Sequence, residues 1–106
     1  MVTTHVLDSA RGRPAAGVAV RLESADGAEI AVGRTDDDGR ITDLGPSDLA
    51  AGTYRLVFDT GGYFAVTGQL GFYPEVVIAF ALGDPAEHYH VPLLLAPFAY
   101  STYRGS

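Results

Sequence analysis

Short stretches of alternating hydrophobic and polar residues, separated by glycine and proline, recur along this chain. In residues 18–23 two valines and a leucine alternate with Ala, Arg and Glu, the period-2 pattern of a half-buried strand. Residues 54–59 repeat the alternation. Residues 28–35 are a further candidate strand, which runs into a turn at 36–39 where Asp-Gly supplies a positive φ.

The second half of the chain continues this pattern with longer apolar runs. Residues 76–82 are almost continuously apolar, which predicts a strand buried on both faces. Residues 88–96 are extended in character and end at Pro97. Because Pro92 lies inside that run and lacks an N–H, we expect it at a sheet edge or a bulge. Residues 100–104 could form a last strand.

Helical signals are few. Residues 47–51 could form one helical turn with Ser47 as its N-cap, and Gly61-Gly62 reads as a hairpin turn. About seven or eight short strands with frequent turns are typical of an all-β sandwich. The length, 106 residues, suits a single domain spanning 1–106.

Composition and charge exclude several classes of function. The net charge is −6 and all 7 basic residues are arginine, so we expect neither a nucleic-acid partner nor a polybasic membrane anchor. There is no cysteine, which excludes disulfides and thiolate chemistry. No apolar run approaches a membrane span and the N-terminus lacks a signal-peptide layout, so we expect a cytoplasmic protein.

The chain has 3 histidines, the side chains that titrate nearest neutral pH. His88 and His90 are two residues apart in a predicted strand and should project from one face. With His5 as a third nitrogen ligand and a water, they could form an open zinc site. Nothing in the sequence brings His5 near the pair, so a purely structural histidine pair is the alternative.

Each of two polar segments can be interpreted as purely structural or as part of a functional site. The acidic turn at 36–39 lacks the spaced oxygen ligands of a calcium loop, which favours a solvated turn with Arg40 paired to its carboxylates. Residues 100–106 hold two tyrosines and an arginine close to the end, where chains usually fray. They form either a strand with a polar stub or a docked end that presents Tyr103, Arg104 and the terminal carboxylate to a site. A serine nucleophile lacks its G-x-S-x-G motif.

Several motifs, in order along essentially the whole chain, resemble the transthyretin-like family. They are Thr4-His5-Val6-Leu7-Asp8, Gly12-Arg13-Pro14-Ala15, Gly33-Arg34-Thr35-Asp36, Asp38-Gly39-Arg40, Tyr73-Pro74-Glu75-Val76 and His88-Tyr89-His90-Val91-Pro92. The ending Tyr103-Arg104-Gly105-Ser106 resembles the hallmark of the enzymatic branch of that family, the 5-hydroxyisourate hydrolases.

The resemblance implies a transthyretin-like two-sheet β-sandwich of about eight strands. It places one short helix at 60–67, where the pattern alone reads a hairpin. It further implies a homotetramer with active sites at the dimer–dimer interface. The implied activity is hydrolysis of 5-hydroxyisourate to 2-oxo-4-hydroxy-4-carboxy-5-ureidoimidazoline in urate degradation, with no cofactor and no metal. The alternative is a transthyretin-like carrier of a small ligand, without catalysis.

Carried over residue by residue, the resemblance implies two overlapping groups of site residues. The catalytic group is His5, Arg40, His90 and Ser106, and the substrate-binding group is His5, Arg40, Tyr103, Arg104 and Gly105. His88 is expected just behind the site. In hormone-carrying transthyretins the first three catalytic positions hold Lys, Glu and Thr and the last four residues are missing.

The residue types fit this chemistry. A neutral His90 is a suitable general base for water, and a nearby Arg40 would disfavour the imidazolium form of that ring. Arg40 could also hold the oxygens of the substrate through its paired N–H donors. His5 could position the water or protonate the leaving nitrogen, while Tyr103 and the chain end orient the substrate.

Overall fold

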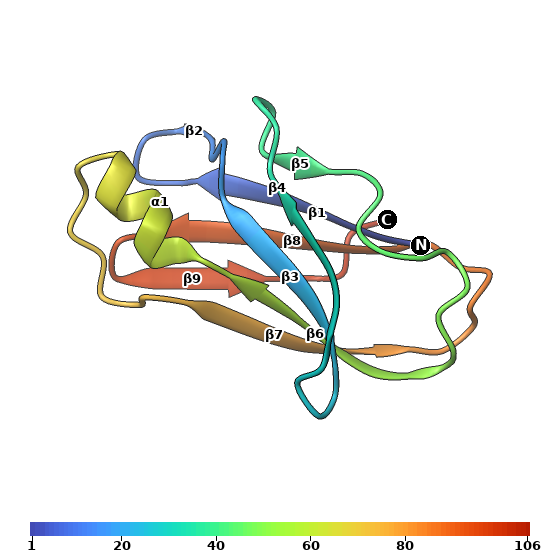
Figure 1. Ribbon diagram of the computed structural model, residues 1–106. Coiled ribbons are helices and arrows are strands. Elements are labelled where there is room, and N and C mark those ends of the chain that lie inside the picture. Colours follow the sequence, from blue (N-terminus) through green and yellow to red (C-terminus); the bar gives the residue numbers. More distant parts are fainter.

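The computed structural model describes all of residues 1–106 and contains two packed β-sheets with one short helix (Figure 1). A 5-stranded sheet has the order β2-β1-β8-β9, with β5 also paired to β1, and a 4-stranded sheet has the order β4-β3-β6-β7. The elements are β1 Val2–Asp8, β2 Arg13–Pro14, β3 Ala19–Ser24, β4 Glu29–Arg34, β5 Arg40–Ile41, β6 Gly52–Phe58, α1 Thr60–Val66, β7 Val76–Leu82, β8 Tyr89–Ala96 and β9 Ala99–Thr102.

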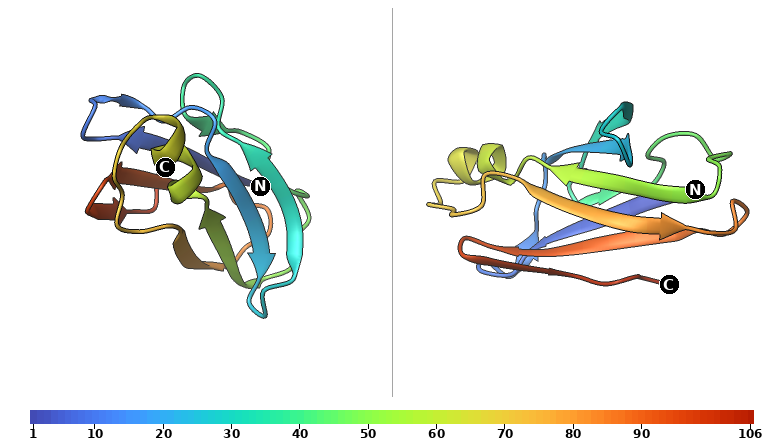
Figure 2. Two further views of the ribbon diagram at one scale, coloured as in Figure 1. Left: turned by 60° about the vertical axis from the view of Figure 1, so that its left-hand side comes forward. Right: turned by 90° about the horizontal axis from the view of Figure 1, so that it is seen from below.

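The all-β sandwich predicted from the sequence is confirmed, with nine strands instead of about eight, because β2 and β5 are separate pairs of residues. The two sheets enclose a core of 19 buried hydrophobic residues. The period-2 segments supply it as expected, for Val20 and Leu22 of β3 and Leu56 and Phe58 of β6 are at most 1% exposed. Figure 2 shows the two layers edge-on, with α1 at one end of the sandwich.

Strand β7 is buried on one face only, so the prediction of a strand buried on both faces is wrong. Val76, Ile78 and Leu82 face the core, whereas Val77 is 38% exposed. The reason is that β7 belongs to the 4-stranded layer of a two-layer sandwich, and that layer packs on the core with one face only. Its outer face is covered by nothing else in a single chain.

Helix α1 occupies the position that the family resemblance implied, and the hairpin read from Gly61-Gly62 is wrong. The two glycines are needed for close contacts around the helix start. Asp59 accepts a hydrogen bond of 3.0 Å from the Gly62 N–H. A Cβ on Gly61 would lie 2.9 Å from the carbonyl oxygen of Pro74, to which the Gly61 N–H donates at 2.8 Å.

The helical turn predicted for residues 47–51 is absent, and this segment is irregular. It lies between Gly45, which has a φ of 83°, and the start of β6 at Gly52. A turn this short gains too few hydrogen bonds to offset the cost of nucleating a helix.

Pro92 lies in a strand with a neighbour on each side, because β8 runs between β1 and β9. The expected edge is local, since β9 ends before it reaches Pro92. The register that pairs Leu93 with Thr102 and His90 with Gly105 places Pro92 opposite Tyr103. The ladder is interrupted there, since proline has no N–H to donate. Strand β9 therefore ends at Thr102, and the expected strand over 100–104 is shorter than predicted.

Helix α1 is tied to β1 by a buried carboxylate. Asp8 is 1% exposed and accepts hydrogen bonds from the Tyr63 hydroxyl (2.6 Å), the Gln69 side chain (3.0 Å) and the Arg11 N–H (2.9 Å). Burial opposes ionisation of Asp8, but these hydrogen bonds outweigh it and hold its pKa below the ordinary value. Burial, the hydrogen bond to Asp8 and the charge of Asp8 raise the pKa of Tyr63 to about 12.

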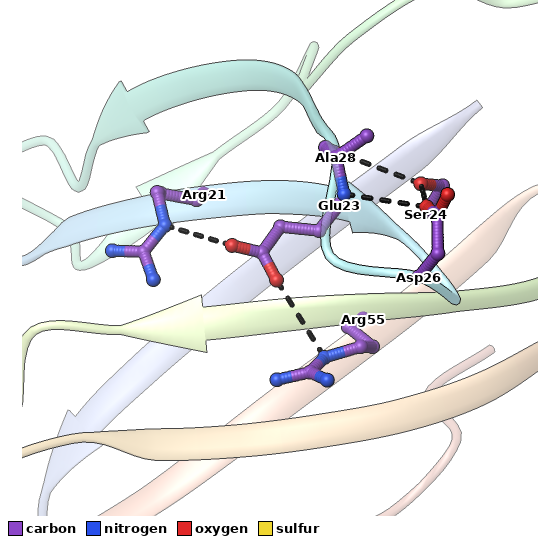
Figure 3. A network of polar contacts seen from close by, with 6 residues as sticks. All are labelled: Arg21, Glu23, Ser24, Asp26, Ala28 and Arg55. Carbon is purple, nitrogen blue, oxygen red and sulfur yellow. Dashed lines mark hydrogen bonds and ion pairs between the residues drawn. The ribbon is translucent and has the colours of Figure 1, made fainter.

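A second polar network lies on the outer face of the 4-stranded sheet (Figure 3). The Glu23 carboxylate accepts a hydrogen bond from Arg21 Nε at 3.0 Å through one oxygen, and its other oxygen forms an ion pair with Arg55 Nε at 3.5 Å. Beside it the Ser24 hydroxyl donates to Asp26 in the turn that leads into β4. This network joins β3 to β6, and it lies on the sheet that carries none of the predicted site residues.

No helix in the structure has the length and apolar character to cross a membrane.

Candidate active site

The predicted site residues from three strands gather on the outer face of the 5-stranded sheet. His5 of β1 lies opposite Arg40 of β5, and Thr3 of β1 lies beside His90 of β8. Thr3 and His5 are two residues apart and share one face. Their neighbours Val2 and Val6 are fully buried on the core face, so Thr3 and His5 point away from the core.

The acidic turn before β5 holds Arg40 in place. The Asp36 carboxylate accepts hydrogen bonds from the N–H groups of Asp38 and Arg40, both at 2.9 Å. Gly39, with a φ of 76°, approaches β1 so closely that a Cβ would overlap the Val6 carbonyl oxygen. The turn carboxylate is therefore bound to backbone, and the Arg40 guanidinium forms no ion pair within the chain.

The end of the chain lies against His90. The Gly105 N–H donates a 2.8 Å hydrogen bond to the His90 carbonyl oxygen, which forms an isolated antiparallel bridge. This contact brings both chain ends to the same end of the sandwich (Figure 1). It also places Ser106 on the face that carries Arg40 and His90.

A surface cavity of about 240 Å³ lies at this point. Its lining includes four residues of interest, Arg40, His88, His90 and Ser106, together with Met1, Thr3, Thr4, Ile41 and Thr42. His5 does not line the cavity but neighbours it through its pairing with Arg40. The cavity therefore brings an imidazole, a guanidinium and the chain end within one small space.

Tyr103 and Arg104 lie on the other side of His90. Both line a separate cavity of about 310 Å³, to which His90 also contributes. The Arg104 guanidinium lies 4.7 Å from the centre of the Tyr89 ring, within range of a cation–π contact, and 3.8 Å from the exposed Glu87 carboxylate. In the single chain these two tail residues are thus apart from the cavity of Arg40.

The environment of His90 keeps its imidazole neutral. Burial lowers the pKa of His90 below its ordinary value, and the charges of Arg40, His88 and His5 lower it further. A neutral imidazole at neutral pH is the form that can accept a proton. The sequence-based expectation that Arg40 disfavours the imidazolium agrees with this arrangement, in which burial is the larger cause.

Thr3 is a site residue that sequence reasoning missed. Its Oγ1 atom lies 2.7 Å from His88 Nε2 and 2.8 Å from His90 Nδ1. The available signal was its spacing of two from His5, which puts both on one face of a strand. That signal has no meaning until the parallel register of β1 and β8 is known, and a single sequence does not provide it.

The metal-site interpretation gains no support from the side-chain arrangement. No group of three or more His, Asp or Glu side chains is placed so that it could hold a metal ion. His88 and His90 have ring centres 6.1 Å apart and share the Thr3 hydroxyl. They are a hydrogen-bonded pair linked through a third residue.

Known proteins resemble this chain over its whole length. The sequence profile of the HIUase/Transthyretin family matches residues 2–105. The 5-hydroxyisourate hydrolase of Caulobacter vibrioides is 48% identical and the match covers 99% of this chain and 97% of that protein. The structure of Klebsiella pneumoniae 5-hydroxyisourate hydrolase superposes with a TM-score of 0.91 at 41% identity, covering 99% and 98% of the two chains. Transthyretin from Sparus aurata superposes with a TM-score of 0.89 at 34% identity, covering 98% and 95%.

Proposed function

The chain belongs to the HIUase/Transthyretin family, and we propose that His90 and Arg40 carry out its reaction, the hydrolysis of 5-hydroxyisourate. It is an enzyme of the hydrolase type, as its closely similar relatives are named. The observation that carries the residue assignment is the cavity of about 240 Å³ in which Arg40, His90 and Ser106 meet.

His90 acts as the general base. The reaction adds water to a ring amide carbonyl, so a proton must leave the water as its oxygen attacks the carbon. The lowered pKa of His90 keeps the imidazole ready to take that proton near neutral pH. The proton is afterwards delivered to the ring nitrogen whose bond to the carbonyl carbon breaks.

Arg40 stabilises the charge that develops on the carbonyl oxygen. Its guanidinium is free of carboxylate partners and lines the same cavity as His90. A donor preorganised for an oxyanion contributes about 10²- to 10³-fold in rate in other hydrolases. His5, beside Arg40 in the sheet, positions the water or protonates the leaving nitrogen. Ser106 supplies a hydroxyl and the terminal carboxylate at the cavity wall.

The assembly is a homotetramer in this proposal, with active sites at the interface between dimers and no cofactor. The site lies on an outer sheet face, and several large apolar side chains near the β8–β9 turn are exposed, namely Leu70, Phe72, Phe98 and Tyr100. Exposed apolar groups of this kind are typical of association surfaces. Within the assembly Tyr103 and Arg104 bind substrate, and Gly105 supports His90. Light scattering on the purified protein tests the tetramer. The cytoplasmic location stays a prediction.

A spectrophotometric assay tests the activity. Urate oxidase generates 5-hydroxyisourate from urate, the protein is added, and the decay of absorbance is compared with that in buffer. We expect a faster decay with the wild type and a strongly reduced acceleration with His90→Gln. A folded tetramer that gives no acceleration contradicts the hydrolase function and leaves the small-ligand carrier, the alternative that the likeness to transthyretin suggests.

A further inference from the structure

One hydroxyl group links two histidines at the candidate site. Thr3 Oγ1 lies 2.8 Å from His90 Nδ1 and 2.7 Å from His88 Nε2. Thr3 is 6% exposed and is held beside His90 by the parallel pairing of β1 and β8. Water therefore has little access to the hydroxyl, and the two imidazoles are its partners.

A threonine hydroxyl has one proton to donate and lone pairs to accept. Between two ring nitrogens, it can donate to only one, and the other ring must then donate to it. Two arrangements satisfy every atom. In the first, His90 donates from Nδ1 and Thr3 donates to His88 Nε2. In the second, His88 donates from Nε2 and Thr3 donates to His90 Nδ1.

The two arrangements leave His90 with opposite chemistry. Its Nδ1 is occupied by Thr3, and its Cδ2 edge lies against Gly105, where a Cβ would overlap it. Nε2 is thus the ring nitrogen left for the substrate side. In the first arrangement Nε2 carries a lone pair, and in the second arrangement it carries the proton of a neutral ring and cannot act as a base.

From this geometry we infer that Thr3 and His88 are positioning residues that hold His90 in the Nδ1–H tautomer, with the Nε2 lone pair free. The inference rests on the proposed function, in which His90 is the base. Arg40 favours the same arrangement, since a guanidinium has only donors and repels a protonated ring. In this role the Thr3 hydroxyl acts through His90 and takes no part in bond making or breaking.

The charged and titratable groups around His90 make the arrangement sensitive to pH. They are Arg40 on β5, His5 on β1, His88 before β8, the amino group of Met1 and the terminal carboxylate of Ser106 at the first cavity, and Arg104 at the second. A proton on His88 Nε2 turns that ring into a donor toward Thr3. The hydroxyl then donates to His90 Nδ1 and the tautomer reverses. Acid therefore inactivates the site in two ways, by protonating His90 and by protonating His88.

Nitrogen NMR reads the tautomer directly and needs no substrate. Two-bond ¹⁵N–¹H correlation spectra of protein labelled at histidine distinguish Nδ1–H, Nε2–H and imidazolium rings. The chain has 3 histidines, so single variants assign every ring. We expect wild-type His90 in the Nδ1–H form at pH values where both imidazoles are neutral. A wild-type His90 in the Nε2–H form would overturn the inference, whatever the activity assay shows.

Thr3 variants test the link. We expect Thr3→Val to lose the fixed tautomer of His90. Its kcat should fall about 10- to 100-fold with a smaller change in KM, an effect similar in size to removing the partner that orients a metal-binding histidine in other proteins. Thr3→Ser should restore both the tautomer and kcat. Thr4→Val is the matched control, because the Thr4 hydroxyl donates to the Val91 carbonyl and to no histidine. It should leave the His90 tautomer unchanged. Retention of both tautomer and kcat in Thr3→Val contradicts the inference.

His88 variants give a second route that does not alter β1. His88→Leu removes the acceptor for the Thr3 hydroxyl, whereas His88→Gln offers an amide oxygen in its place. We expect the leucine variant to lose the Nδ1–H tautomer and the glutamine variant to keep it. Equal behaviour of the two variants overturns the role of His88. The tautomers could follow these expectations while neither the wild type nor any variant hydrolyses 5-hydroxyisourate. In that case the proposed function is wrong, but the role of Thr3 and His88 in fixing the His90 tautomer is confirmed.

Discussion

Gly105 lies directly against the imidazole of His90. Its N–H donates to the His90 carbonyl oxygen at 2.8 Å, and a Cβ at this position would overlap His90 Cδ2. The glycine near the chain end is therefore a requirement of contact with the ring. This is a physical reason for glycine at this place in the Tyr-Arg-Gly-Ser ending.

Substitution of Gly105 should damage the site while the sandwich stays folded. In Gly105→Ala the new methyl group must push away either the ring of His90 or the chain end. We expect kcat/KM to fall about 10- to 100-fold, because small misplacements of catalytic groups have effects of that size. Gly83→Ala is a matched control, since its Cβ would meet only the Tyr89 hydroxyl at 3.7 Å. Equal kinetics for the two variants would contradict this account.

Removal of the Arg40 charge should shift the pH profile. Arg40 is one of the groups that lower the pKa of His90, so Arg40→Gln raises that pKa. The inactive imidazolium then persists to higher pH, and the acid limb of kcat/KM moves upward in pH. The plateau should also fall about 10²- to 10³-fold with the lost oxyanion donor.

The measurement for Arg40→Gln is a pH series of initial rates, compared with Arg34→Gln. Arg34 is the last residue of β4, in the other sheet, and its side chain donates only to the Gly17 carbonyl. We expect its acid limb at the wild-type position. An acid limb that moves downward in Arg40→Gln is the wrong sign for this electrostatic role.

The buried carboxylate of Asp8 should make stability depend on pH. Its pKa is lowered in the folded state, so the unfolded state binds more protons around the ordinary Asp pKa. The stabilisation is fully present above that pKa and is lost as pH falls through the lowered pKa of the folded protein. Asp8→Asn should reduce the free energy of unfolding at neutral pH by about 2–4 kcal/mol, since it removes charge-assisted hydrogen bonds in a buried place.

Urea unfolding at several pH values measures both effects of Asp8→Asn. The variant should lose part of the pH dependence below pH 4, because Asn does not titrate. The exposed Asp37 forms no side-chain hydrogen bond that would be lost, and Asp37→Asn is the control with near wild-type stability. An unchanged acid slope in Asp8→Asn would mean that other carboxylates dominate acid unfolding.

Chelation should leave the activity intact. The proposed reaction uses the His90 imidazole and the Arg40 guanidinium, and no side-chain group in the structure is arranged for a metal ion. Dialysis against EDTA followed by the 5-hydroxyisourate assay provides the measurement. A loss of activity that added zinc reverses would restore the metal-site interpretation of His88 and His90.

Local patterns predicted much of the sheet architecture but not its edges or its helix. Period-2 segments such as that in β3 gave the right face to the core, since alternation needs no knowledge of neighbours. The apolar run of β7 misled because its outward residues are apolar as well, although they face away from the core. Helix α1 contains two glycines, and its stability comes from the burial of Tyr63 and Phe64, which is a tertiary effect.

The candidate site was likewise predicted only in part from the sequence. The family resemblance supplied His5, Arg40, His90 and the chain end, and their roles remain proposals that the variants above test. Thr3 was missed because its partners lie 85 and 87 residues away. No periodicity in a single sequence encodes such a register. It follows from the pairing of β1 with β8, which only the folded chain displays.

That pairing has a consequence for the order of events during synthesis. Strand β1 is synthesised well before its partner β8, with six strands and the helix between them. During the interval β1 lacks its main neighbour, and closing so long a loop makes this step slow. A nascent chain stalled before β8 therefore leaves one edge of β1 without its long partner, a target for holding chaperones, and it cannot yet contain the site.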